Sequence, residues 1–114
     1  MFIDGAWCEA EGGGRFEVLN PADGAVIGEV ADGGAAEATR AVEAAARAFP
    51  DWSRTTAWRR AELLLKAHAL MLDRREELAR TMTEEQGKPL RAARNEVQYG
   101  ADFLIWFAEE AKRV

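Results

Sequence analysis

Apolar residues in the last quarter of the chain recur on two opposite faces of one predicted helix, from Pro89 to Val114. At about 100° per residue, two separate stripes form. One stripe holds Tyr99, Phe103, Trp106 and Phe107, and the other holds Val97, Ala101, Leu104, Ala108 and Ala111. A helix that covers a small domain needs only one apolar stripe. The pattern therefore predicts a helix between two layers, in a chain that forms part of something larger.

Two helices are expected after Gly33-Gly34, where the apolar period becomes helical. The first should end at Pro50, because proline fits poorly inside a helix. Its inward face would consist of Ala38, Val42, Ala45, Ala46 and Phe49. The second runs from about Thr56 to Leu72 and is apolar around most of its circumference. We expect the second helix to be among the most buried elements.

A third helix is expected from a capping box at Asp73-Arg74-Arg75-Glu76, in which Asp and Glu side chains bind free N–H groups of the first turn. It should run through Glu85 and stop at Gln86-Gly87-Lys88-Pro89. Glycine adopts the left-handed conformation after a last turn, lysine favours the negative helix end, and proline can open the next helix. The sequence thus predicts a break followed by the two-faced helix.

Residues 1–33 carry the signals of strands and turns. Asp4-Gly5 predicts a tight hairpin between Phe2-Ile3 and Ala6-Trp7, since such turns require positive φ. Gly12-Gly13-Gly14 is expected to be a flexible connection. The segments Phe16 to Val18 and Ala25 to Ala31 read as strands on either side of the turn Asn20 to Gly24.

The predicted fold class is α/β, and α+β within this segment: a β-hairpin and short strands followed by four helices. At 114 residues the chain fits one domain, 1–114, with a strand region at 1–33 and a helical region at 34–114.

Composition is that of a globular protein, and charge excludes some partners. Fifteen Lys and Arg stand against twenty Asp and Glu, for a net charge of −5, so no basic footprint for nucleic acid or an anionic membrane is present. Inside the predicted helices the longest apolar run is Leu63-Leu64-Leu65, far short of a membrane span. The first residues lack a basic region followed by an apolar one. We expect a cytoplasmic protein, and one cysteine permits no internal disulfide.

Residues with reactive side chains are few. Cys8 follows a predicted hairpin strand with no histidine near it in sequence, which favours a plain small residue. His68 lies within the Leu-rich second helix, where a partly buried ring with one hydrogen-bond partner is expected. Gly12-Gly13-Gly14 leads into a strand, unlike a dinucleotide-binding fingerprint, and Gly87-Lys88 is followed by proline in place of the Ser or Thr of a phosphate-binding loop.

The aromatic stripe of the last helix has two interpretations. Asn95, Glu96 and Glu110 fall on or beside it, so an apolar surface is flanked by polar groups. A subunit interface has this composition, and so does the wall of a substrate tunnel. Packing or an interface is favoured, because aromatic stripes at helical spacing are usually buried.

Taken together, the motifs closely resemble the start of the NAD(P)-dependent aldehyde dehydrogenase superfamily over the whole chain. The resemblance rests on Phe2 to Trp7, Leu19 to Gly24 with Val26-Ile27-Gly28, Ala44 to Trp52, and Glu85 to Leu90. Glu85 to Pro89 and the closing Trp106 to Arg113 are most similar to the succinate-semialdehyde dehydrogenase branch.

The resemblance implies oxidation of a small aldehyde to an acid by a Cys thiolate, with hydride passing to NAD or NADP and a Glu-activated water opening the thioester. The family's nucleophile, oxyanion-stabilising Asn, general-base Glu and main cofactor contacts lie beyond the matched region, and Cys8 does not align with the nucleophile. We therefore expect no catalytic or cofactor-binding residue here, an inactive isolated chain, and a homo-oligomer at full length.

Four residues can be carried over from the resemblance. Tyr99 and Phe103 would help to wall the substrate entrance. Glu85, with a main-chain carbonyl near Val18, would help to hold a structural monovalent cation.

Three hypotheses remain open. The chain is the N-terminal portion of an aldehyde dehydrogenase, its two-faced helix covered by the rest of the enzyme. Alternatively, it is a stand-alone interaction or oligomerisation module that associates through its aromatic face. The third hypothesis is a self-sufficient enzyme that uses Cys8 or His68.

Overall fold

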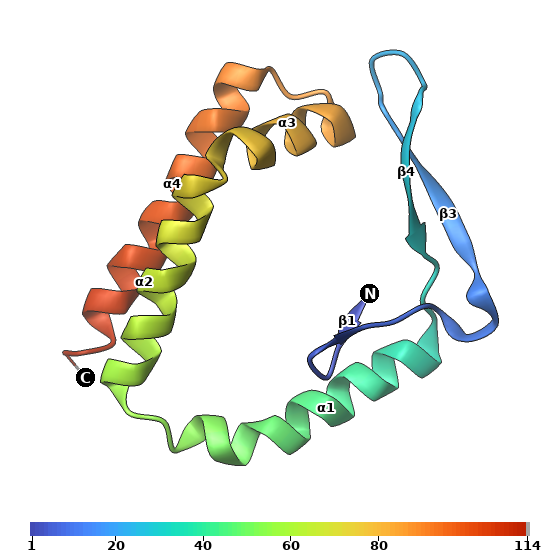
Figure 1. Cartoon of the computed structure of the whole chain (residues 1–114). Helices are drawn as coiled ribbons and strands as arrows, with labels where there is room; N and C mark the ends of the chain where they lie inside the picture. Colours follow the sequence, from blue (N-terminus) through green and yellow to red (C-terminus); the bar gives the residue numbers. More distant parts are fainter. Residues whose placement is uncertain (114) are drawn as a thin grey trace. The chain divides into compact units, whose positions relative to one another are not determined.

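Strands and helices follow one another in the predicted order. The computed structural model describes residues 1–113, which form two antiparallel two-stranded sheets and then four α-helices (Figure 1). This confirms the predicted fold class of short strands followed by helices. Two compact units are present: Met1–Leu19 with Gly24–Arg54, and Asn20–Asp23 with the chain from Thr55 onward.

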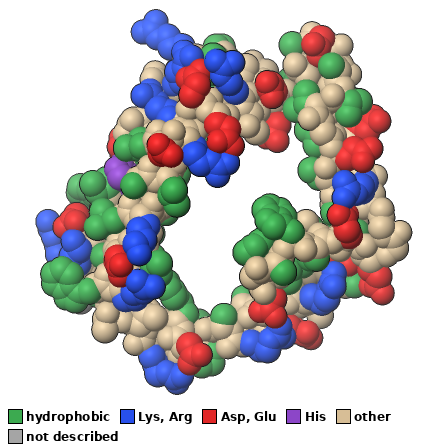
Figure 2. Space-filling view, in the orientation of Figure 1, with side chains coloured by type: hydrophobic (Ala, Val, Ile, Leu, Met, Phe, Trp, Pro, Cys, Tyr) green, Lys and Arg blue, Asp and Glu red, His purple; other side chains and the backbone are tan. Residues whose placement is uncertain are grey.

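In the first unit, the strands β1 (Phe2–Ile3) and β2 (Ala6–Trp7) form the predicted hairpin. Its two turn residues, Asp4 and Gly5, have φ values of 55° and 78°, the positive values that a tight hairpin turn requires. The Phe2 and Trp7 rings meet edge to face with centroids 5.5 Å apart. Both rings are exposed, and Figure 2 shows apolar side chains gathered over this hairpin.

The second pair of strands is β3 (Arg15–Leu19) and β4 (Val26–Ala31), joined in an antiparallel register with an irregularity between Val18 and Leu19. The glycine-rich segment before β3, expected to be a flexible connection, forms a short 3₁₀ turn, η1 (Glu11–Gly13). Gly12 has a φ of 83° there, a conformation that glycine adopts without steric cost.

Helix α1 (Ala35–Ser53) continues through Pro50, so the predicted end at that residue is wrong. The proline lies in the last turn, where its missing N–H removes a single hydrogen bond of the helix. The Ser53 hydroxyl donates to the Pro50 carbonyl oxygen at 2.9 Å, and the Arg54 N–H donates to the carbonyl oxygen of Asp51. These bonds hold the final turn together.

The predicted inward face of α1 is exposed among the described residues. Val42 is 69% exposed and Phe49 is 65% exposed, and within α1 only Glu37 and Ala44 are buried. The apolar period was therefore correct for a helix, but it did not indicate what covers the apolar face.

In the second unit, helix α2 (Ala57–Asp73) is capped by the preceding Thr56, whose hydroxyl accepts the Arg59 N–H at 3.2 Å. As expected, this helix is among the more buried elements: nine of its 17 residues are buried or half-buried, against two of 19 in α1, although only Ala61 is fully buried. Helix α2 packs along one side against α4 (Leu90–Glu110) (Figure 1). Trp58 and Leu70 lie outside this contact and are exposed.

Helix α3 (Arg75–Gln86) follows after a break at Arg74, but the predicted capping box does not form. Asp73 is the last residue of α2 and caps nothing. The Glu76 carboxylate instead accepts two hydrogen bonds from Arg94 of α4, at 2.7 and 2.8 Å. A bidentate guanidinium satisfies both carboxylate oxygens and is a stronger partner than one backbone N–H.

The turn between α3 and α4 has the predicted chemistry. Gly87 is left-handed, with a φ of 71°, and its N–H donates to the Thr83 carbonyl oxygen at 2.9 Å. Pro89 immediately precedes α4, which begins at Leu90. Lys88 forms an ion pair with Glu96 of α4. Val114, the end of the predicted last helix, lies outside the described residues.

The core of the second unit is made of small side chains. Fully buried positions there are Ala61, Ala79, Ala93, Val97, Ala101 and Ala108. Larger side chains pack around this centre without being fully buried: Met71, Leu78, Met82 and Leu90. Small residues let helix backbones approach closely, so these helices are held by close contact of alanine faces. None of the helices in residues 1–113 is long and apolar enough to cross a bilayer.

Candidate functional site

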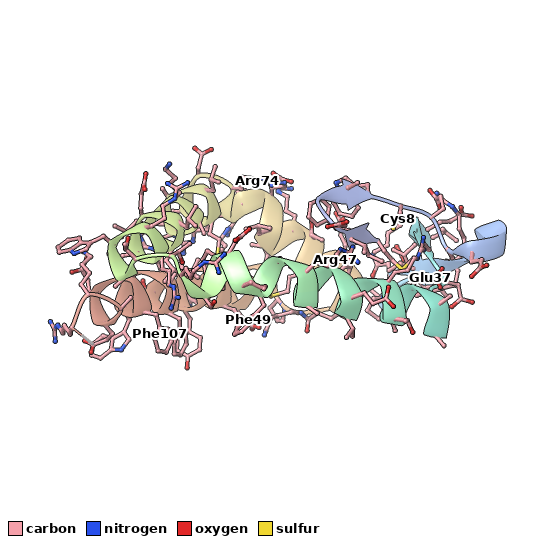
Figure 3. All side chains as sticks on the ribbon, turned by 90° about the horizontal axis from the view of Figure 1, so that it is seen from below. Cys8, Glu37, Arg47, Phe49, Arg74 and Phe107 are labelled. Atoms are coloured by element: carbon pink, nitrogen blue, oxygen red, sulfur yellow. The ribbon has the colours of Figure 1, made fainter. Side chains whose placement is uncertain are left out.

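Helix α4 has the two faces that the sequence predicts. Val97, Ala101 and Ala108 are buried against the neighbouring helices, whereas the aromatic face is open within the described chain. The exposed fractions on that face range from 45% for Phe103 to 64% for Tyr99 and Trp106. Figure 3 shows Phe107 projecting away from the α4 ribbon. This face is the strongest candidate for a binding surface.

The aromatic rings are ordered by contact with one another. Tyr99 and Phe103 meet edge to face with centroids 4.8 Å apart, and Phe103 stacks on Phe107 at 6.3 Å. Such pairs stabilise ring positions beyond their area burial. Together with Asp102 and Trp106, the three rings line an open groove of about 260 Å³. The structure thus brings both predicted entrance residues, Tyr99 and Phe103, into one groove.

The charged groups around this groove already have partners. The Asp102 carboxylate accepts a hydrogen bond from the Gln98 side chain at 2.9 Å, and Glu96 pairs with Lys88. In contrast, within residues 1–113 the Asn95 side chain and the Tyr99 hydroxyl make no hydrogen bond to protein. The lining of the groove therefore includes one exposed acidic side chain, that of Asp102.

His68 is a structural residue, as expected. Its ring is partly buried, and Nδ1 lies 2.9 Å from the carbonyl oxygen of Ala101. One hydrogen bond accounts for the ring, with no second reactive group involved. The prediction of a partly buried ring with one partner is confirmed.

Cys8 is partly buried after β2, where its N–H and carbonyl oxygen pair with Met1. Its side chain borders two surface depressions that also contain arginines, Arg15 in one and Arg40 with Arg47 in the other. Across residues 1–113, no three His, Cys, Asp or Glu side chains cluster in a way that could hold a metal ion.

The two residues expected near a monovalent cation lie in different parts of the fold. Glu85 is exposed in the last turn of α3, and Val18 is half-buried in β3. They belong to different compact units, so the cation site stays a prediction.

Glu37 is a buried carboxylate that binds the start of α1 to the segment before β3, and the sequence analysis did not identify it. It is only 5% exposed, and its carboxylate accepts the N–H groups of Gly34 at 2.8 Å and Glu11 at 2.9 Å, with Arg40 at 3.1 Å (Figure 3). The backbone bonds from Gly34 and Glu11 lower the pKa of the Glu37 carboxyl. The available signal was a Glu three residues after the helix-starting Gly34, the spacing of a capping box.

Residues 7–114 match the sequence profile of the Aldehyde dehydrogenase family, nearly the whole chain. The chain belongs to the aldehyde dehydrogenase family. Its strands and helices correspond to the N-terminal quarter of the solved structures of this family.

Two curated relatives illustrate the similarity of this aldehyde dehydrogenase chain. A 3-sulfolactaldehyde dehydrogenase of Pseudomonas putida is 56% identical over 113 residues, which are 99% of this chain and 23% of that protein. An NADP⁺-dependent succinate-semialdehyde dehydrogenase of Escherichia coli is 46% identical over 112 residues, covering 98% of this chain and 23% of that protein. The chain thus spans less than a quarter of the length of these relatives.

Solved structures give the same result for the fold. The succinate-semialdehyde dehydrogenase from Burkholderia pseudomallei superimposes with a TM-score of 0.96 at 45% identity, covering 99% of this chain and 23% of that one. A betaine aldehyde dehydrogenase from Staphylococcus aureus, solved with NAD⁺, gives a TM-score of 0.92 at 32% identity, over 95% of this chain and 22% of that one. Relatives therefore use NAD⁺ or NADP⁺.

Proposed function

We propose that this chain forms the N-terminal part of an NAD(P)-dependent aldehyde dehydrogenase that oxidises a short, acid-bearing aldehyde, such as succinate semialdehyde, through a Cys thioester. The supporting observation is similarity to relatives named for 3-sulfolactaldehyde and for succinate semialdehyde. These two aldehydes share a short carbon chain and an anionic group, a sulfonate in one and a carboxylate in the other. The common chemistry defines the proposed substrate class.

The residues described here do not fit the dinucleotide cofactor. Dinucleotide phosphates are typically bound by a glycine-rich loop at a helix N-terminus. Gly12 to Gly14 leads into strand β3, and at the start of α1 the Gly34 N–H is already bound by the Glu37 carboxylate. A phosphate at that position would meet a negative charge. We assign cofactor binding and the nucleophile to the part of the enzyme outside the matched quarter.

Within this proposal, the chain supplies a helical framework and one wall of the substrate entrance. Tyr99 and Phe103 are the proposed wall residues, because their rings line an open groove and are steadied by ring contacts. A monovalent cation held by Glu85 and a main-chain carbonyl near Val18, and a homo-oligomeric assembly, complete the proposal for the whole enzyme.

A hybrid enzyme tests the proposed function. This chain would replace the matched quarter of the E. coli succinate-semialdehyde dehydrogenase, with which it shares 46% identity. The hybrid should reduce NADP⁺ in the presence of succinate semialdehyde. The isolated chain and the E. coli remainder should each be inactive. A hybrid that is folded by circular dichroism and has the size of the parent enzyme, but shows no turnover, would overturn the proposal.

One observation favours the second hypothesis, an association module: the aromatic face of α4 is exposed. Sedimentation of the purified chain at micromolar concentration distinguishes the two hypotheses. A monodisperse, folded oligomer that dissociates into monomers when Trp106 is replaced by Ser would favour the module. Aggregation with binding of an apolar dye would favour a segment that requires the rest of an enzyme.

A further inference from the structure

Helix α2 contacts α4 at two adjacent residues near the middle of α4. The His68 Nδ1 atom lies 2.9 Å from the carbonyl oxygen of Ala101, which has no exposed surface. One residue earlier, a Cβ placed on Gly100 would lie 3.4 Å from the Met71 Cε atom, so the end of this side chain packs against the glycine. A polar bond and a close apolar contact thus join the two helices at one point.

This contact point lies between residues that line the aromatic groove. Tyr99 immediately precedes Gly100, and Asp102 and Phe103 follow Ala101. Each helical residue has a fixed angular position relative to its neighbours. Any rotation or sliding of α4 at Ala101 would therefore move the Tyr99 and Phe103 rings as well. The contact with α2 sets where the groove lies on the second unit.

The two kinds of contact differ in how well they fix α4. Apolar burial between alanine faces is non-directional, so it resists separation of the helices more than it resists sliding. A hydrogen bond weakens steeply as its angle departs from linear, so it also opposes rotation. We propose that His68 is a positioning residue, which holds α4 so that Tyr99 and Phe103 lie at the substrate entrance. This inference rests on the proposed function, and in it His68 touches neither substrate nor cofactor.

The hybrid enzyme tests this role through separate values of KM and kcat. His68→Leu removes the donor and keeps a side chain of similar bulk. KM for succinate semialdehyde should rise by about twofold to fivefold, because loss of one net hydrogen bond can lower the population of correctly placed α4 by no more than about this factor. The value of kcat should not change, since saturating substrate restores that population and the reacting groups are assigned to the rest of the enzyme.

A pair of amide variants tests the position of the donor. The amide nitrogen in His68→Asn is as many bonds from the backbone as Nδ1, so it can donate to the same carbonyl oxygen and should restore the parent KM. His68→Gln places its amide nitrogen one bond farther out, at the distance of Nε2, and should behave like His68→Leu.

Leu78→Val is the control for a general loss of stability. It removes a methylene from a side chain that packs at the contact of α3 with α4, away from the bond of His68. It should lower the melting temperature of the hybrid about as much as His68→Leu does, because each change costs on the order of 1 kcal/mol. Its KM should equal that of the parent.

The outcomes separate the two proposals. An unsubstituted hybrid without activity overturns the proposed function and the positioning role together. An active hybrid in which His68→Leu leaves KM unchanged, lowers kcat instead, or raises KM no more than Leu78→Val does, overturns the positioning role alone. Equal KM values for His68→Asn and His68→Gln also overturn it. A KM that rises in His68→Leu and returns to the parent value in His68→Asn supports it.

Discussion

The Nδ1 atom of His68 on α2 donates a hydrogen bond to the carbonyl oxygen of Ala101 on α4, across 2.9 Å. A carbonyl oxygen can only accept, so Nδ1 must carry a proton. This polar bond joins two helices whose fully buried residues, Ala61 on α2 and Ala93, Val97, Ala101 and Ala108 on α4, are all apolar.

Replacement of His68 by Leu should lower the free energy of unfolding by about 1 kcal/mol, the typical net contribution of one hydrogen bond. Urea unfolding followed by circular dichroism measures the change. Lys66→Ala, on the exposed side of the same helix, removes only a surface ion pair with Glu62 and should change stability by less than about 0.5 kcal/mol. Equal effects of the two variants would argue against a structural role for the imidazole.

Ala93→Leu should destabilise the second unit by about 1–3 kcal/mol, because a larger side chain cannot be accommodated where the alanine is fully buried. Ala92→Leu is the matched control: it makes the same change at the neighbouring position, which is exposed on the same helix. Thermal unfolding of both variants gives the comparison. A tolerated Ala93→Leu would mean that α3 and α4 separate easily.

Glu37 predicts a specific pH dependence of stability. Because its pKa is lower in the folded chain than the ordinary 4.5, its contribution is fully present above that value and is lost as pH falls through the folded pKa. Glu37→Gln should therefore be less stable than the parent at neutral pH. The difference in stability between the two proteins should shrink as the pH falls below 4.5. The urea unfolding midpoints of both proteins, determined at several pH values above and below 4.5, measure this difference.

Glu43→Gln is the control for the Glu37 variant, since Glu43 is exposed on the same helix. Its stability profile with pH should follow that of the parent. A Glu37→Gln profile parallel to the parent at every pH would contradict the role assigned to the buried carboxylate.

Gly87→Ala should cost more than about 1 kcal/mol, because a Cβ is strained at a φ of 71° and would also lie 3.2 Å from Pro21 Cγ. Gly28→Ala, where a Cβ meets nothing within 4 Å, is the control and should cost less. Gly87→Asn should be intermediate, since Asn tolerates the left-handed conformation better than Ala. Chemical unfolding ranks the three variants.

Local chemistry explains which elements could be predicted from the sequence. The positive-φ hairpin at Asp4-Gly5 and the left-handed stop at Gly87 are set by residues close together in the chain. The end of α1 was misplaced because a proline in the last turn costs one hydrogen bond, which other bonds there offset. A capping box at Asp73 was wrong because a more distant guanidinium, Arg94, binds the glutamate.

The candidate site was predictable to a similar extent. Helical spacing alone placed Tyr99 and Phe103 on one exposed face, and the ring contacts follow from that spacing. The buried Glu37 could not be anticipated from period, since one of its partners, Glu11, is 26 residues away in the chain. Burial of the apolar face of α1 was overestimated because a periodic pattern indicates an apolar face and not what covers it.

The two faces of α4 have a fixed angular relationship, because each residue turns the helix by about 100°. Inserting one residue before Val97 would turn everything beyond it by about 100°, bringing bulky rings toward the alanine contacts and turning Tyr99 and Phe103 away from the open face. Insertions and deletions in this helix should therefore be far less tolerated than substitutions on its open face. Side-chain identity on that face can change to suit a new ligand, while the length of the helix cannot.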